Sequence, residues 1–357
     1  MPNLQSVERR ALDFLATLCA TYTPAGREAA LLPPIEAELR RLGARVEAYP
    51  LEGAQGEGRA NLLASWGESR VLFSTHLDVV PPELPVRAAE GFVAGRGACD
   101  AKGQIGAQLG AIELLLASGI RDIAWLGVAG EESDSAGARA SLALAPSFSA
   151  CRAIIVGEPT GCALATGQRG YVRARLTCKG KAAHGATPEL GENALLALMD
   201  WLSAVRKAGD ERGPEGLLGG EAWNLGLISG GRAANVVPDL AQAEIALRTV
   251  PDGAMRDALE SSRPEHGSIE ILVDDPWALF DTPAGFPAAP VPFASDLAVM
   301  RALAPRAAAI LAGPGRASLA HTGAEELTLE ELSAGIALFR DLGLRYLSNS
   351  ALAKGSI

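Results

Sequence analysis

The stretch RVLFSTHLDVVP, residues 70–81, joins a continuous apolar run to a histidine and an aspartate two positions apart. A short apolar run rich in β-branched and aromatic residues predicts a buried strand, which here ends on His76 and Asp78. Two later runs end in the same way: IAWLGVAGEE on Glu131 and Glu132, and AIIVGEP on Glu158. Acidic and imidazole side chains therefore recur at predicted strand ends.

Two further segments extend this pattern. AAAILAGPGRASLAH follows a predicted strand with a Gly-Pro-Gly turn and ends on His321, and the glycine-rich loop GRGACDAKG places Asp100 just before a helix expected from about Gln104. In an open α/β sheet, ligands gather at the carboxyl ends of the strands, so these side chains should converge. Converging carboxylates repel one another without a cation. Oxygen and nitrogen donors suit Zn²⁺, Co²⁺ or Mn²⁺, and five donors suit two ions about 3.5–4 Å apart that share a carboxylate.

The remaining pattern predicts the fold class. Helical spacing occurs over residues 4–22, 27–43, 104–119 and 327–348, between short apolar runs at 70–75, 122–129, 151–157 and 306–313. This alternation predicts a doubly wound α/β domain with a mixed sheet. Period-two alternation then predicts a β-α-β-β-α-β, ferredoxin-like α+β domain inserted at residues 167–277, which leaves 1–166 and 278–357 as the metal-binding domain.

Composition limits the partners and the compartment. A chain of 357 residues with 48% hydrophobic and 21% charged residues is expected to form two globular domains. Its net charge of -10 argues against a nucleic acid or an anionic membrane as partner. Five scattered cysteines without a CxxC pair, no signal-peptide pattern and no long apolar run favour the cytoplasm.

The ordered segments THLDVVP, GRGACDAKG, AGEES, VGEPT, KGKAAHGATPELGENAL, ANVVP and GPGRASLAHTGAEEL resemble the dinuclear metallopeptidase and deacylase family that includes acetylornithine deacetylase, succinyl-diaminopimelate desuccinylase, aminoacylase-1 and carboxypeptidase G. The resemblance spans nearly the whole chain. It implies two divalent metal ions, with zinc preferred and cobalt or manganese as alternatives. It also implies that the inserted domain is a lid and dimerisation domain.

The resemblance also implies a role for each metal-site residue. The implied ligand set has Asp100 between the two ions, His76 and Glu158 on one ion, and Glu132 and His321 on the other.

Two neighbours of these ligands would act without binding metal. Glu131 would be the general base that takes a proton from the attacking water. Asp78 would orient His76 through its second ring nitrogen.

Three residues of the inserted domain match the family's substrate-binding positions. His184, in KAAHGATP, would reach the active site of the partner subunit and stabilise the tetrahedral oxyanion, which implies a homodimer. Asn235 and Arg248 would hold the oxyanion and the carboxylate of a small N-acyl-amino acid.

The sequence leaves several functions open. The spacing GPG…AH resembles the acetylornithine deacetylase branch of arginine biosynthesis and favours removal of an acetyl group, although Ala101 stands where many members have methionine. The alternatives within the family are a desuccinylase and a metallo-dipeptidase or carboxypeptidase. Two other classes are a non-catalytic peptide-binding relative, which the intact ligands disfavour, and a nucleotide-binding protein, which Asp100 in the glycine-rich loop disfavours because it would repel a phosphate.

Overall fold

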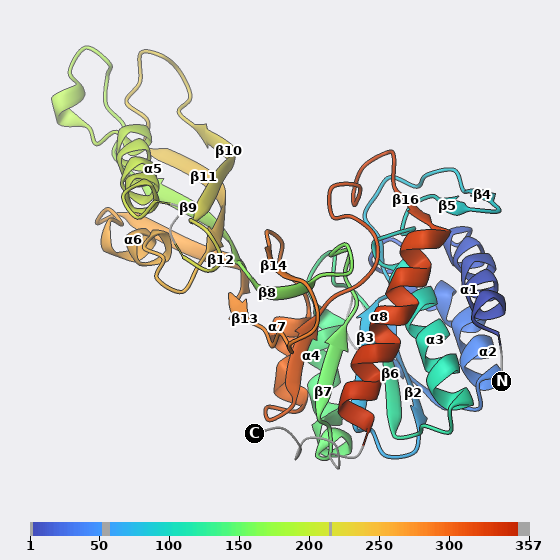
Figure 1. Ribbon diagram of the computed structural model, residues 1–357. Helices are drawn as coiled ribbons and strands as arrows, with labels where there is room; N and C mark the ends of the chain where they lie inside the picture. Colours follow the sequence, from blue (N-terminus) through green and yellow to red (C-terminus); the bar gives the residue numbers. More distant parts are fainter. Residues whose placement is uncertain (1–2, 52–57, 214–215, 349–357) are drawn as a thin grey trace, which may run out of the picture. The chain divides into compact units, whose positions relative to one another are not determined.

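The computed structural model describes residues 3–51, 58–213 and 216–348, which form two compact units (Figure 1). Unit 1 comprises Met1–Ala165, Phe280–Ala289 and Ser295–Ile357, and unit 2 comprises Thr166–Leu279 and Pro290–Ala294. The stretch Pro290–Ala294 belongs to unit 2, although it lies within residues 278–357, which are predicted to be part of the metal-binding domain. Each unit is described separately below.

A mixed sheet forms the centre of unit 1. In the described residues its strand order is β1 (Arg45–Pro50), β2 (Ala60–Trp66), β6 (Ile123–Val128), β3 (Val71–His76), β7 (Ala153–Val156) and β15 (Ala308–Leu311). Strand β3 runs parallel to β6 and β7, and β15 runs parallel to β7, whereas β2 is antiparallel to both β1 and β6. The predicted doubly wound α/β fold with a mixed sheet is confirmed, and β1 and β2 extend it beyond the predicted strands.

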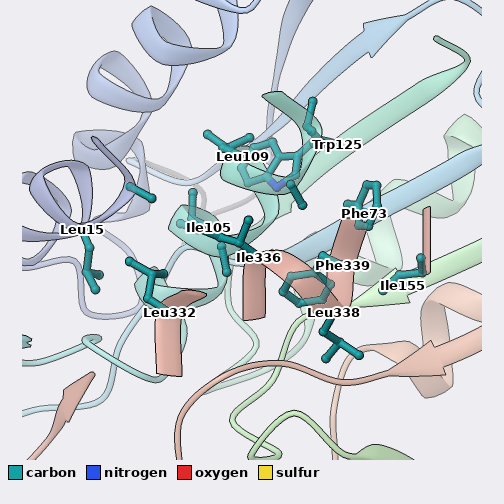
Figure 2. Packing of buried hydrophobic residues seen from close by; sticks show 14 of the residues in the cluster. Leu15, Phe73, Ile105, Leu109, Trp125, Ile155, Leu332, Ile336, Leu338 and Phe339 are labelled. Atoms are coloured by element: carbon teal, nitrogen blue, oxygen red, sulfur yellow. The ribbon is translucent and has the colours of Figure 1, made fainter. Parts of the chain in front are cut away.

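Three helices build the larger core against this sheet: α1 (Leu4–Cys19), α3 (Lys102–Ala117) and α8 (Leu329–Leu347). Figure 2 shows Phe339 of α8 next to Phe73 of β3, and their rings meet edge to face with centroids 6.1 Å apart. Alternate strand positions such as Leu72 and Leu126 are also fully buried, so both faces of the sheet are covered. This explains the continuous apolar runs in the sequence.

Shorter elements complete unit 1. The 3₁₀ helices are η1 (Glu28–Leu31), η2 (Leu142–Phe148) and η4 (Arg301–Leu303), and the short α-helices are α2 (Leu32–Arg41), α4 (Ala136–Ser141) and α7 (Leu297–Met300). The single helix predicted over residues 27–43 is therefore wrong in detail, because it breaks into η1 and α2. Pro33 and Pro34 lie in the first turn of α2, where a backbone N–H has no helical partner and its absence costs no hydrogen bond.

A small sheet joins the first and the last chain segments of unit 1. Strand β5 (Phe92–Ala94) pairs with β4 (Arg87–Ala89) and with β16 (Glu326–Thr328), which directly precedes α8. The Thr328 side chain caps α8 in a reciprocal pair with Glu331, which fixes where that helix begins. Of the remaining short strands, β8 (Leu164–Gln168) and β14 (Ala288–Val291) begin in unit 1 and end in unit 2, and β13 (Ala278–Leu279) belongs to unit 2.

Unit 2 has the predicted β-α-β-β-α-β order. It runs through β9 (Gly170–Lys179), η3 (Pro188–Leu190), α5 (Ala194–Asp210), β10 (Ala222–Gly230), β11 (Leu240–Thr249), α6 (Met255–Ser261) and β12 (Gly267–Asp275). The antiparallel sheet has the order β10-β11-β9-β12. Along β9, Val172, Ala174, Leu176 and Cys178 are buried with α5 and α6, as their period-two spacing predicts.

None of the helices in the described part of the chain combines the length and the apolar character that crossing a bilayer requires.

Candidate metal centre

Parallel strands deliver the candidate ligands to one edge of the unit 1 sheet. His76 is the last residue of β3, Glu158 lies two residues after β7, and Glu131 and Glu132 follow β6. Because these three strands are parallel neighbours, their carboxyl ends meet at the same edge. His321 lies in the loop that follows β15, the neighbour of β7.

Asp100 lies between the two imidazoles. One carboxylate oxygen of Asp100 is 3.0 Å from Nε2 of His76, and the other is 3.3 Å from Nε2 of His321. The same nitrogen of His321 is 2.8 Å from an oxygen of Glu132. His76 and Asp100 are buried, whereas His321 is half exposed. A carboxylate with one oxygen toward each of two imidazoles is the arrangement expected of a ligand shared between two ions.

Asp78 fixes the loop that carries the paired glutamates. Its buried carboxylate accepts hydrogen bonds from the backbone N–H groups of Gly130, Glu131 and Glu132, at 3.0, 3.1 and 3.0 Å. Nδ1 of His76 lies 3.0 Å from the backbone oxygen of Asp78 and 3.5 Å from its carboxylate. The main hydrogen bonds of this carboxylate therefore hold the Glu131 loop, in addition to the predicted contact with His76.

An arginine also holds the loop that carries Glu131 and Glu132, by binding Asp134 in the same loop. Arg59, directly before β2, is buried and binds Asp134 through both terminal nitrogens, at 3.0 and 2.8 Å. Its Nε lies 3.3 Å from the buried carboxylate of Glu28. Gly130 has a φ of +84°, and a Cβ there would lie 1.7 Å from Arg59, so a glycine is required for this close approach.

Burial and mutual repulsion shape the electrostatics of the cluster. Burial, with the neighbouring charge of Glu158, raises the pKa of Glu131 well above its usual value. Burial also raises the pKa of Glu158. Burial alone would raise the pKa of Asp100 as well, but hydrogen bonds from His321 and His76 hold it below the ordinary range. Hydrogen bonds to Asp100 and Glu132 raise the pKa of His321 to about 10. These raised pKa values mean that the cluster by itself favours the protonated forms of Glu131, Glu158 and His321.

The donors fit divalent cations. Ligand atoms of His76, Asp100 and Glu158 lie within 4.8 Å of one another, and the same holds for Asp100, Glu132 and His321. These two groups share Asp100. A third group of the same kind joins His76, Glu131 and Glu132. One carboxylate oxygen of Glu158 is buried without a hydrogen-bond partner, which is costly unless a cation occupies the space before it.

Two residues near the cluster are absent from the sequence-based set. Asp296, at the start of α7, is buried, and its charge contributes to the raised pKa values of Glu131 and Glu158. Glu325 is buried and accepts a hydrogen bond from the backbone N–H of Asp100 at 3.1 Å. The glutamate pair four and five residues after His321 is the only sequence signal for Glu325, and it resembles an ordinary solvated turn.

The three remaining predicted residues lie in unit 2. His184 is exposed and pairs with Val236, and the backbone of its neighbour Gly185 bonds Asn235, so the His184 and Asn235 loops lie side by side. Nδ1 of His184 accepts a hydrogen bond from the backbone N–H of Ala186 at 3.0 Å. In the neutral ring the proton is then on Nε2, which is available as a donor.

Arg248 lies on β11 of the same unit. Its guanidinium carbon lies 4.4 Å from the centre of the Tyr171 ring, which stacks beneath it. The register of β11 and β9 places these two residues directly opposite each other.

Comparison with known proteins establishes the family. Residues 166–263 match the peptidase dimerisation domain of the M20 family. A probable carboxypeptidase of Aspergillus terreus is 33% identical over 302 residues, which cover 76% of this chain and 70% of that protein. A probable carboxypeptidase of Aspergillus fumigatus is 33% identical over 315 residues, which cover 79% of this chain and 71% of that protein.

The chain belongs to the M20 peptidase family. This confirms the family predicted from the sequence motifs, whose members are metal-dependent hydrolases. Solved M20 structures have the same fold. One is a metallo-carboxypeptidase of Sulfolobus solfataricus, with a TM-score of 0.68 and 16% identity over 96% of this chain and 98% of that one. Another is a dinuclear metal-binding peptidase of Bacillus subtilis, with a TM-score of 0.68 and 16% identity over 96% and 99%.

Proposed function

We propose that this M20 peptidase is a dinuclear amidohydrolase that removes a small acyl group, preferably acetyl, from an N-acyl-amino acid with a free α-carboxylate. One observation carries the proposal. The two oxygens of Asp100 each face one imidazole, with Glu131 on the adjacent loop among the same donor atoms. This arrangement combines a shared metal ligand with a nearby proton acceptor.

The five ligands divide between two ions in the proposed centre. One ion would be held by His76 and Glu158, the other by Glu132 and His321, and Asp100 would serve both. Imidazole and carboxylate donors without a thiolate favour Zn²⁺, with Co²⁺ and Mn²⁺ as substitutes. When bound, such ions supply Lewis-acid chemistry that acidifies water and polarises a carbonyl.

Glu131 moves the proton in this proposal. Its carboxylate accepts a proton from water as the water oxygen bonds to the amide carbonyl carbon. When the tetrahedral species collapses and the C–N bond breaks, Glu131 returns the proton to the leaving nitrogen. This gives the carboxylic acid and the amine, and the acid then passes its proton to the amine, which leaves as an ammonium ion. Burial, with the neighbouring charge of Glu158, raises the pKa of Glu131 and so favours the protonated form that this residue takes between the two steps.

Unit 2 supplies the proposed substrate contacts. Nε2–H of His184 would donate to the developing oxyanion together with the amide of Asn235. Arg248 would bind the α-carboxylate, since its planar guanidinium matches two carboxylate oxygens. Its contact with Tyr171 limits the orientations of the guanidinium and so supports this role.

A second candidate differs only in the acyl side of the substrate. The relatives at 33% identity are named probable carboxypeptidases, and a carboxypeptidase also releases an amino acid whose carboxylate is free. The same Arg248 contact would serve both substrates. The spacing of the GPG…AH segment supports the acetyl group, in a branch that acts in arginine biosynthesis.

A substrate panel tests the proposal. The zinc-loaded protein is assayed with N-acetyl-, N-succinyl- and N-peptidyl forms of one amino acid, and with the methyl ester of the acetyl compound. We expect the acetyl compound to be fastest and its ester to lose about tenfold or more in kcat/KM, because the ester lacks the negative charge that strengthens hydrogen bonds to a guanidinium. A preference for the peptide would support the carboxypeptidase. Equal rates on acid and ester would exclude the Arg248 contact.

We also propose a homodimer that forms through unit 2. Strand β10 is an edge of the antiparallel sheet, and its side chains are exposed, including Leu227 at 63% and Ile228 at 50%. The nearby helix α5 exposes Leu196 and Met199 at 57% and 56%. An exposed apolar edge strand is a template for pairing with another chain, and these residues fall within the matched dimerisation domain.

Subunit mixing tests this dimer and the role of His184. His184→Ala and Glu131→Gln variants, each inactive alone, are combined into verified heterodimers. If His184 acts across the interface, one of the two sites is complete, and about half of the wild-type activity returns. No recovery would assign His184 to its own subunit, and a monomer by light scattering would exclude the dimer.

A cytoplasmic setting is the last part of the proposal. All five cysteines lie in the described residues as free thiols. Reduced thiols are usual in the cytosol. Alkylation of the denatured protein, isolated without reductant, should modify each of them, whereas an intact disulfide would contradict this compartment.

A further inference from the structure

A buried ion pair contacts the loop that carries the candidate ligand Asp100. Glu325 and Arg96 have exposed side-chain fractions of only 1% and 3%, and Oε2 of Glu325 is 2.7 Å from Nη1 of Arg96. The other oxygen, Oε1, accepts hydrogen bonds from the backbone N–H groups of Gly97, Cys99 and Asp100, at 3.0, 3.3 and 3.1 Å. One carboxylate thus holds the loop that ends at Asp100.

The same pair holds the loop that carries His321. Arg96 donates to the backbone oxygen of Thr322, the next residue, at 3.4 Å, and to the backbone oxygen of Pro82 at 3.1 Å. The backbone oxygen of Glu325 accepts from the N–H of Gly95 at 3.0 Å, next to the pairing of β16 with β5. The Asp100 loop and the His321 loop are therefore joined through two side chains 229 positions apart.

His321 needs this support more than His76 does. His76 ends a central strand and is 1% exposed, whereas the His321 side chain is 52% exposed. His321 also has a φ of +65°, a left-handed conformation that costs a non-glycine residue energy. Neither burial nor backbone preference fixes its position.

We propose that Glu325, through Arg96, is the positioning residue that keeps His321 and Asp100 at the spacing required for the second metal ion. This rests on the proposed dinuclear centre. Glu325 touches neither substrate nor ions and acts through the backbone of both ligand loops. Partners that orient metal ligands typically contribute about 10–100-fold to metal affinity.

The proposal predicts a selective defect. In Glu325→Gln the shape is kept, but an amide NH₂ replaces the oxygen that faces Arg96, so two donors oppose each other. We expect the ion held by Asp100, Glu132 and His321 to bind about 10–100-fold more weakly. The other ion shares Asp100 but is also held by the buried His76 and Glu158, so we expect it to be weakened less.

Calorimetric titration of Zn²⁺ into the chelator-treated full chain measures this. The wild type should bind two ions, and Glu325→Gln one tight and one weak ion. Excess Zn²⁺ should restore kcat in the variant, which a general loss of structure would prevent. Glu326→Gln, a change in the adjacent glutamate, is the matched control and should bind like the wild type.

Other results of these titrations would contradict either the positioning role of Glu325 or the dinuclear centre itself. Two ions bound by Glu325→Gln as tightly as by the wild type, or both weakened equally, would overturn the positioning role. If Glu325→Gln fails to fold, Arg96→Lys decides in its place, because it keeps the charge but loses the contact with Thr322. It should show the same selective weakening, and unchanged binding of both ions would refute the proposal. A wild type that binds fewer than two ions would contradict the dinuclear function itself.

Discussion

Replacing Asp78 by asparagine should disturb the Glu131 loop while leaving the shape of the site intact. In the wild type, Oδ1 of Asp78 accepts from Gly130 and Glu131, and Oδ2 accepts from Glu132. In the asparagine variant the amide oxygen takes the place of Oδ1 and the NH₂ group takes the place of Oδ2. This NH₂ group then faces the backbone N–H of Glu132, so that two hydrogen-bond donors oppose each other. His76 keeps its contact with the backbone oxygen of residue 78.

The expected magnitude follows from these hydrogen bonds. An unsatisfied buried donor costs about 1–3 kcal/mol. The two surviving bonds lose the charge that makes such bonds about twice as strong as neutral ones. Together these effects amount to about 2–4 kcal/mol. Since about 1.4 kcal/mol corresponds to a factor of ten, kcat/KM should fall by about 30–1,000-fold if the loop shift is expressed fully in the transition state.

Steady-state kinetics with saturating Zn²⁺ measures the effect, with Asp122→Asn as the matched control. Asp122 also accepts a backbone N–H, that of Glu68 at 2.9 Å, but it precedes β6 and so lies at the other end of that strand. The control should keep its kcat/KM. If Asp78→Asn were as active as Asp122→Asn, the contact between Asp78 and the loop would have no part in catalysis.

Three further outcomes are expected. Glu131→Gln should keep both metal ions by elemental analysis and lose about 10²–10⁴-fold in kcat, whereas loss of metal would make Glu131 a ligand. Phe339→Ala should lower the free energy of unfolding by about 3–5 kcal/mol in denaturant titrations, since it opens a cavity beside Phe73, and a loss below about 1 kcal/mol would contradict that packing. The metal-free protein should lose thermal stability as the pH rises from about 6.5 to about 10. Hydrogen bonds to Asp100 and Glu132 raise the pKa of His321 from 6.5 to about 10 in the folded state. The protonated imidazole therefore stabilises the fold fully below pH 6.5, and this stabilisation is lost as the pH rises through the folded-state pKa. Burial raises the pKa of Glu158 above its ordinary value of 4.5, so ionisation of this carboxyl at higher pH also destabilises the folded state. Calorimetry with and without Zn²⁺ checks this, and flat or rising stability of the metal-free protein would contradict it.

The sequence predicts the sheet and the members of the cluster because both depend on local patterns. A short apolar run followed by His76 or Glu158 indicates a buried strand and the residue at its carboxyl end. A topological rule then brings such ends together, whatever the exact strand order. The broken helix at residues 27–43 shows the limit of this reasoning, since apolar spacing alone does not show where prolines let a helix begin.

Only the tertiary structure decides how these side chains are held. Asp78 reaches Gly130 across 52 positions of chain, and Glu325 reaches Gly97 across 228. Each contact depends on which backbone N–H groups point toward a buried carboxylate after the sheet and helices have packed. The residues next to Asp78 and Glu325 in the sequence do not distinguish a buried carboxylate that accepts backbone hydrogen bonds from an exposed carboxylate in a turn. The sequence by itself therefore determines which residues meet at the sheet edge, whereas their spacing and support follow from long-range packing, because hydrogen-bond geometry is set by the folded backbone.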